Sequence, residues 1–316
     1  MQAFDLWPAT ITPLSASEQA ELLNLLQPLF GGQLALHQLP GKLAAELPRL
    51  YLPLAAWLNQ QRPESGPLLV GLNGSQGSGK STLCRLLKWI LEAAFNCRTG
   101  IISIDDLYLP KAARRKLADQ VHPLLATRGV PGTHDVPLGL ELFSQLKQGT
   151  TGARLAIPRF NKATDDRFPQ EDWDQVTTPV DLILFEGWCV GATAQADEEL
   201  AEPVNRLELK EDSDGSWRRY VNAQLQGPYR ELFDQLDLLL MLKIPTWEIV
   251  YHWRKRQEEQ LAAKQGGSGI MGEVALHRFI MHYERLTKHQ LRVLPDVADL
   301  ILSLNQQQRV TALQVR

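Results

Sequence analysis

Cysteine is scarce in this sequence of 316 residues. Only Cys84, Cys97 and Cys189 are present, and they form no CxxC pair. This spacing argues against a zinc site and against a disulfide framework, and it suits a reducing compartment. Long apolar runs are also missing, because no window of eighteen residues is both apolar and uncharged. We therefore expect no membrane partner.

The sequence also lacks the apolar N-terminal core that a secretory signal needs, since Asp5 and Pro8 interrupt it. A cytoplasmic location is expected. An excess of positive charge is absent, because the formal net charge is -3. No nucleic-acid partner is therefore expected. The hydrophobic fraction of 44% is enough for a sizeable buried core. The sequence does not indicate the oligomeric state.

Residues 1–66 have the pattern of a helical extension. Ser17 precedes an apolar-periodic run with Glu18 and Glu21 near its start, which predicts a capped helix. A second periodic run follows Gly41. No catalytic motif is visible in this region, so we interpret it as a helical cover for the domain that follows.

From residue 67 to 316 the pattern changes to apolar strands that alternate with helical segments. Near-continuous apolar runs of this kind are typical of parallel strands covered on both faces. Strands alternating with helices predict an α/β fold with a doubly wound parallel sheet. The five predicted strands are residues 67–72, 100–104, 180–186, 236–244 and 298–304.

Two long polar segments rich in turn residues interrupt this pattern, at residues 127–178 and 191–230. Insertions of this size in α/β enzymes often contact the substrate. A GGSG stretch at 266–269 predicts a short break between two helical runs.

A phosphate-binding loop follows the first predicted strand. The sequence fits G-x-x-x-x-G-K-[ST], and an amphipathic helix begins directly after it. Glycines allow backbone N–H groups to point at phosphate oxygens, and the helix N-terminus adds positive charge. A Gly/Ser-rich surface loop is the alternative, which the flanking strand and helix argue against. The predicted ATP-binding residues are Gly74, Ser75, Gln76, Gly77, Ser78, Gly79, Lys80, Ser81 and Thr82.

Carboxylates follow two further strands. Asp105 and Asp106 come after residues 100–104, and Glu186 ends the strand at 180–186. Ligands bind at the carboxyl ends of the strands in such sheets, so these side chains should lie near the phosphate loop. One carboxylate can accept the proton of an acceptor hydroxyl, and another, with the Ser81 hydroxyl, can hold Mg²⁺. Solvated turns are the alternative.

These motifs together resemble the pantothenate kinase, uridine kinase and phosphoribulokinase group of P-loop kinases. The loop, the Asp105-Asp106-Leu107-Tyr108 segment and the Glu186-Gly187-Trp188 segment carry this resemblance. Residues 128–135 (RGVPGTHD), 157–162 (IPRFNK) and 253–260 (WRKRQEEQ) look most like the D-glycerate 3-kinase branch. That branch usually has Tyr-Asp-Lys at 160–162 and Gly-Asp-Arg at 165–167, where this chain has Phe-Asn-Lys and Asp-Asp-Arg.

The resemblance implies a five-stranded sheet of order 2-3-1-4-5 and a helical lid at about 250–272. It implies that Asp105 is the catalytic base, that Lys80 and Arg254 neutralise phosphoryl charge, and that Ser81 and Glu186 bind the metal. A charged helix face paired with Glu258 and Glu259 is the alternative for Arg254. The candidates for substrate binding are Tyr108, Arg128, His134, Asp135, Arg159, Lys162 and Arg167.

The sequence therefore predicts an ATP- and Mg²⁺-dependent kinase for a small hydroxyl-bearing metabolite, with D-glycerate or a similar anion as the expected acceptor. Pantothenate, a nucleoside or a sugar phosphate remain possible acceptors within the same fold. A nucleotide-dependent switch protein is the alternative from another class, although a switch has no need of an acceptor base.

Overall fold

The computed structural model describes residues 6–265 and 272–316. The expected GGSG break at 266–269 and the end of the expected lid lie outside these residues. In the described part of the chain, no helix is long and apolar enough to cross a membrane.

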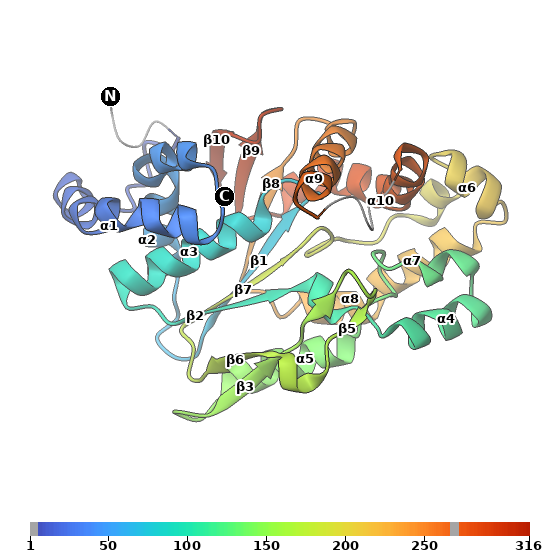
Figure 1. Ribbon diagram of the computed structural model, residues 1–316, viewed down its shortest axis with the longest axis horizontal. Coiled ribbons are helices and arrows are strands. Elements are labelled where there is room, and N and C mark those ends of the chain that lie inside the picture. Colours follow the sequence, from blue (N-terminus) through green and yellow to red (C-terminus); the bar gives the residue numbers. More distant parts are fainter. Residues whose placement is uncertain (1–5, 266–271) are drawn as a thin grey trace.

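A six-stranded sheet forms the centre of the molecule (Figure 1). Five strands run parallel in the order β2-β7-β1-β8-β9, so numbering them along the chain gives the predicted order 2-3-1-4-5. The sixth strand, β10, is antiparallel to β9 and was not predicted. Only Val310 and Leu313 of this strand are buried, so it lacks the continuous apolar run of the other five. The strands are β1 (Leu68–Gly74), β2 (Thr99–Ser103), β7 (Leu182–Gly187), β8 (Leu238–Lys243), β9 (Leu300–Leu304) and β10 (Val310–Val315).

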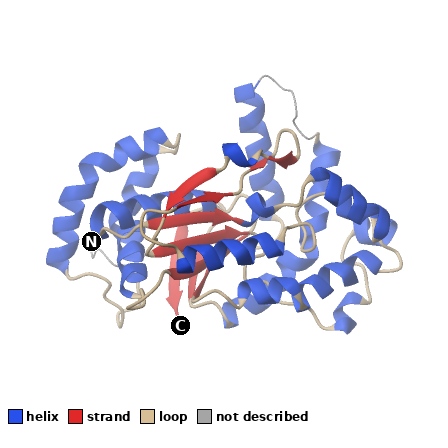
Figure 2. Ribbon diagram, turned by 90° about the horizontal axis from the view of Figure 1, so that it is seen from below, coloured by secondary structure: helices blue, strands red, loops and turns tan. Residues whose placement is uncertain are grey.

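Helices cover both faces of this sheet (Figure 2). Leu68, Val70 and Leu72 of β1 pack into the cluster that contains α2 and α3, whereas Leu69 packs with α5, α8 and α10 on the other face. This alternation follows from the two-residue period of a strand and explains why β1 is apolar throughout. The helices after β1 are α3 (Lys80–Phe95), α4 (Lys111–Gln120), α5 (Val136–Gln148), α6 (Arg206–Glu211), α7 (Ser216–Gln226), α8 (Pro228–Phe233), α9 (Ile249–Gln265) and α10 (Glu273–Val293).

The N-terminal region is helical, as predicted, and contains α1 (Ala16–Leu36) and α2 (Leu52–Gln60). The predicted cap at Ser17 was wrong, because Ser15 caps α1. The Ser15 hydroxyl accepts a hydrogen bond from the backbone of Glu18 at 3.3 Å, and the Glu18 carboxylate accepts one from the Ser15 N–H at 2.8 Å. Both helices share one hydrophobic cluster with α3 and the sheet. A domain boundary near residue 66 remains a prediction.

The polar segment at 127–178 folds into two small hairpins after α5. One pairs β3 (Arg154–Ile157) with β6 (Asp174–Thr177), and the other pairs β4 (Phe160–Asn161) with β5 (Asp166–Arg167). The segment at 191–230 contributes α6 and α7, which lie at the end of the molecule opposite α1 (Figure 1).

Candidate active site

The phosphate loop connects β1 to α3, and its glycines are structurally required. Gly79 has φ of 94° and caps α3, which begins at Lys80. Gly77 has φ of 78°, and a Cβ there would lie 2.8 Å from Cβ of Trp253 on α9. Both positions are in the left-handed region that favours glycine. The loop therefore presents a helix N-terminus, which is a ready anion-binding site.

The polar groups of this loop suit a phosphate ligand. The hydroxyls of Ser75 and Ser78 are buried and have no hydrogen-bond partner among the described residues. Buried polar groups are normally satisfied, so these two are free to bind a ligand. The Lys80 ammonium donates to the Ser75 carbonyl at 3.2 Å and lines the cavity beside the loop.

A hydroxyl and a carboxylate meet at the start of α3. The Ser81 hydroxyl donates to a carboxylate oxygen of Glu186 at 2.8 Å, and Glu186 lies at the end of β7 next to β1. Hydroxyl and carboxylate oxygens are the hard ligands that Mg²⁺ prefers beside phosphate groups. The pair therefore fits the magnesium site that the sequence predicts.

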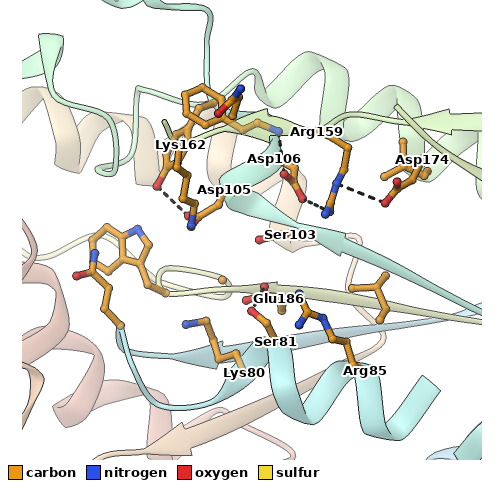
Figure 3. Close-up of a pocket in the computed structure, with 18 of the residues that line it drawn as sticks. Lys80, Ser81, Arg85, Ser103, Asp105, Asp106, Arg159, Lys162, Asp174 and Glu186 are labelled. Carbon is orange, nitrogen blue, oxygen red and sulfur yellow. Dashed lines mark hydrogen bonds and ion pairs between the residues drawn. The ribbon is translucent and has the colours of Figure 1, made fainter. Parts of the chain in front are cut away.

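Asp105 lies on the turn after β2 and faces the phosphate loop across the cavity (Figure 3). Its carboxylate accepts hydrogen bonds from Lys162 at 2.6 Å and from the Tyr108 hydroxyl at 2.8 Å. Burial opposes ionisation of Asp105. The positive charge of Lys162 and these hydrogen bonds outweigh that effect and hold the pKa of Asp105 well below its usual range. Asp105 is therefore an anion at neutral pH.

Asp106 is a structural anchor of the site, a role that no sequence pattern indicated. It is buried, and it accepts hydrogen bonds from Arg159 at 2.8 Å and from the backbone N–H of Phe160 at 3.0 Å. Burial raises the pKa of Asp106 to about 6, and the nearby Arg159 only partly opposes this shift. Arg159 also lies 3.4 Å from Asp174. Asp106 therefore attaches the insertion at 127–178 to the end of β2.

A cavity of about 880 Å³ lies between these elements. In Figure 3, Lys80, Ser81 and Arg85 approach it from α3, and Asp105, Lys162 and Arg159 approach it from the opposite side. Of the residues predicted from sequence, it is lined by Gln76, Gly77, Lys80, Ser81, Asp105, Tyr108, Arg128, Arg159, Lys162, Glu186 and Arg254.

Other lining residues were not predicted. Arg85 lies one helical turn after Ser81, so the helical period could have indicated it. Tyr283 and Phe279 come from α10, almost 100 residues beyond Glu186, and no local signal pointed to them. The Tyr283 hydroxyl donates to the carbonyl of Arg128 at 3.2 Å. This side of the cavity is therefore built by distant segments.

Three predicted substrate residues do not line this cavity. His134 is buried against Tyr108, with ring centroids 4.5 Å apart, and bonds to the Tyr229 hydroxyl. Asp135 caps α5 and pairs with Arg167 at 3.1 Å, and Arg167 also donates to the Tyr108 carbonyl. These contacts support the Asp105 turn from behind. Direct substrate contact by the three remains a prediction.

The insertion at 191–230 contributes no residue to this cavity either. The insertion at 127–178 supplies Arg128, Arg159 and Lys162. Among the described residues, only one of the two insertions predicted from the sequence therefore lines the cavity.

Arg254 on α9 lines the cavity and also has the helix-surface contacts of the alternative interpretation. Its guanidinium pairs with Glu258 at 2.5 Å and bonds to Gln257 at 3.1 Å. It lies 5.9 Å from the centroid of the Phe279 ring. Arg254 therefore lines the cavity, as the kinase interpretation expects, and is paired on its own helix, as the alternative expects. A charge-neutralising role for Arg254 remains a prediction.

The buried His134 makes stability dependent on pH. The Tyr229 hydroxyl accepts from the N–H groups of Gly132 and His134, so its proton points to Nδ1 of His134 at 2.5 Å. Burial lowers the pKa of His134 from 6.5 to about 3. The folded state binds this proton less tightly than the unfolded chain. The stabilisation is therefore complete above pH 6.5 and is lost as the pH falls toward 3.

We expect the free energy of unfolding of the wild type to fall between pH 7.5 and 5, with His134 contributing about 2 kcal/mol of that loss. His134→Gln should have a smaller loss by that amount. Urea unfolding at both pH values measures the difference. The pKa values of His282 and Asp106 are also shifted, but these groups are present in both proteins and cancel. Equal losses in the two proteins would contradict the assignment.

The chain is similar to known kinases. No protein-family model matches the chain. The chloroplastic D-glycerate 3-kinase of Arabidopsis thaliana is 29% identical over 256 residues, which cover 76% of this chain but only 53% of the plant protein. The chain thus spans about half the length of that relative. The uncharacterized kinase mug58 of Schizosaccharomyces pombe is 31% identical over 231 residues, covering 71% of this chain and 81% of that kinase.

A solved structure has the same fold. The D-glycerate 3-kinase of Cryptococcus neoformans superimposes with a TM-score of 0.68 at 25% identity, covering 84% of this chain and 97% of the fungal one. The parallel sheet and the loop between β1 and α3 are those of a P-loop kinase. With the sequence similarity to mug58, they show that this chain belongs to the family of P-loop kinases that includes the D-glycerate 3-kinases.

Proposed function

We propose that this protein is an ATP-dependent kinase that transfers the γ-phosphoryl group to a hydroxyl of a small anionic metabolite, with D-glycerate as the acceptor. One observation carries the proposal. The phosphate loop with its Ser81–Glu186 pair and the Asp105 carboxylate face each other across one cavity. A phosphoryl donor and a hydroxyl acceptor need this arrangement.

In this mechanism the loop binds the phosphates of ATP through its backbone N–H groups. Lys80 neutralises charge on the β- and γ-phosphates, and Arg254 approaches the same region from α9. Ser81 and Glu186 would hold Mg²⁺, which supplies charge neutralisation on the phosphates when it is bound. Asp105 accepts the proton of the acceptor hydroxyl as the hydroxyl oxygen bonds to the γ-phosphorus. The bond from that phosphorus to the β-phosphate oxygen breaks, and ADP leaves.

The charges of the acceptor side support an anionic metabolite. Arg128, Arg159 and Lys162 line the cavity on the side of Asp105. A carboxylate needs charge-assisted donors of this type. Two relatives named D-glycerate 3-kinase, at 29% and 25% identity, also support an anionic acceptor.

The test is Mg-ATP turnover with D-glycerate, pantothenate, uridine and ribulose 5-phosphate in parallel. Selective turnover of D-glycerate is the expected result. Selective turnover of another acceptor would keep the mechanism and overturn the substrate. ATP binding without stimulation by any of the four would count against the kinase proposal and favour the nucleotide-dependent switch.

A further inference from the structure

Both oxygens of the Asp105 carboxylate are occupied. One accepts from the Lys162 ammonium at 2.6 Å, and the other accepts from the Tyr108 hydroxyl at 2.8 Å. The Lys162 side chain is 62% exposed and that of Asp105 is 32% exposed, so the ammonium covers the carboxylate from the solvent side. Figure 3 shows Lys162 and Asp105 joined at the edge of the cavity. An acceptor hydroxyl that approaches Asp105 therefore meets Lys162 first.

Lys162 differs from the two arginines on the same side of the cavity. Arg128 is paired with Asp165, which also pairs with Arg114. Arg159 is held between Asp106 and Asp174. Those arginines bind carboxylates that have no proposed part in the chemistry. The only ion-pair partner of Lys162 among the described residues is the proposed base itself.

The backbone that carries Lys162 is held independently of this ion pair. The Asp166 carboxylate accepts from the backbone N–H of Lys111 at 3.0 Å, and Arg167 pairs with Asp135 at 3.1 Å. The β4–β5 hairpin is therefore fixed at other points, and the four-carbon side chain of Lys162 can change partner without moving it.

We propose that Lys162 is a specificity-determining residue that keeps Asp105 covered until the negatively charged group of the acceptor takes its ammonium. This inference rests on the proposed function, because it assumes that Asp105 is the base. The anionic acceptor then supplies both the hydroxyl that reacts and the negative charge that draws the Lys162 ammonium away from Asp105. A neutral alcohol, or water, cannot compete for the ammonium and leaves Asp105 paired.

The energetic basis is the same charge that lowers the pKa of Asp105, because a carboxylate stabilised by an ammonium is a weak base. When Lys162 moves to the acceptor, the pKa of Asp105 rises toward its usual range and the carboxylate accepts a proton more readily. In the side reaction, a water oxygen bonds to the γ-phosphorus, the bond to the β-phosphate oxygen breaks, and Asp105 takes the proton of the water. The ion pair suppresses this hydrolysis.

The test is Lys162→Met, with Lys116→Met on the exposed face of α4 as the matched control. We expect ATP hydrolysis without any acceptor to rise about tenfold in Lys162→Met and the preference for D-glycerate over glycerol to fall by about the same factor. The acid limb of the hydrolysis rate should move to higher pH, because Asp105 has lost its cation. Lys162→Arg should restore low hydrolysis, and Lys116→Met should behave as the wild type.

Unchanged or lower hydrolysis in Lys162→Met, with the preference for D-glycerate retained, would overturn the inference. Combining Lys162→Met with Asp105→Asn should abolish the rise, and persistence of the rise in the double variant would also overturn it. Asp105→Asn alone separates the two proposals. If Asp105→Asn leaves turnover unchanged, the base role is wrong. If Asp105→Asn is inactive but Lys162→Met has the hydrolysis and acceptor preference of the wild type, only the role of Lys162 is refuted.

Discussion

Asp105→Asn is expected to lower turnover by roughly 100- to 10,000-fold, the range that removal of a general base produces. Asparagine keeps the shape of the side chain and one hydrogen-bond acceptor for Tyr108, but it cannot take a proton from the acceptor hydroxyl. Steady-state turnover with saturating Mg-ATP and the acceptor from the panel measures the effect. Asp119→Asn, an exposed position on α4, is the control and should be neutral.

Nucleotide binding should change little in this variant, because Asp105 approaches the cavity from the side opposite Lys80 and Ser81 (Figure 3). ATP affinity measured by calorimetry or fluorescence should stay within about threefold of the wild type, less than 1 kcal/mol. A loss of ATP affinity as large as the loss of turnover would mean that Asp105 supports the nucleotide site instead. Turnover equal to the wild type would remove Asp105 from the base role.

Arg114→Met is expected to lower the free energy of unfolding by roughly 3–5 kcal/mol, because three backbone carbonyls lose their donor at about 1–3 kcal/mol each. The Arg114 side chain is 1% exposed. It donates to the carbonyls of Leu109 at 3.1 Å, Ala126 at 2.8 Å and Asp165 at 2.7 Å, and it pairs with the Asp165 carboxylate at 2.9 Å. Methionine fills part of the volume but leaves these acceptors without a donor.

The neighbouring residue provides the control. Arg115 is exposed, so Arg115→Met removes the same charge and should change the unfolding free energy by less than about 0.5 kcal/mol. Urea unfolding of both variants measures the difference. Similar values for the two would show that the Arg114 contacts contribute little. Because Arg114 holds Asp165 at the tip of the hairpin that carries Lys162, we also expect weaker acceptor binding in Arg114→Met.

The Asp165 contacts account for a departure from the family pattern. The D-glycerate 3-kinase branch usually has glycine at this position. Asp165 has φ of 57°, in the left-handed region that glycine prefers and that aspartate tolerates better than most residues. Its carboxylate pairs with Arg114 and Arg128. The extra acid thus holds the hairpin and pairs with Arg128, which lines the cavity.

The parallel sheet, the phosphate loop and the two carboxylates at strand ends could be predicted from sequence patterns alone. Each has a local cause. A parallel strand covered on both faces must be apolar along its length, and the loop between β1 and α3 needs glycines at Gly77 and Gly79. The strand-end carboxylates Asp105 and Glu186 could be placed together because parallel strands bring their carboxyl ends to one edge.

Which charges pair at that edge could not be predicted, because the pairs depend on long-range packing. Lys162 lies 57 residues from Asp105 in the chain, and Arg159 lies 53 residues from Asp106. No periodicity relates residues so far apart, so sequence patterns could name candidates on the insertions but not their partners. Whether a side chain such as His134 lines the cavity or supports it from behind depends on how the hairpins and α10 pack. Long-range packing sets that orientation, and local propensity does not contain it.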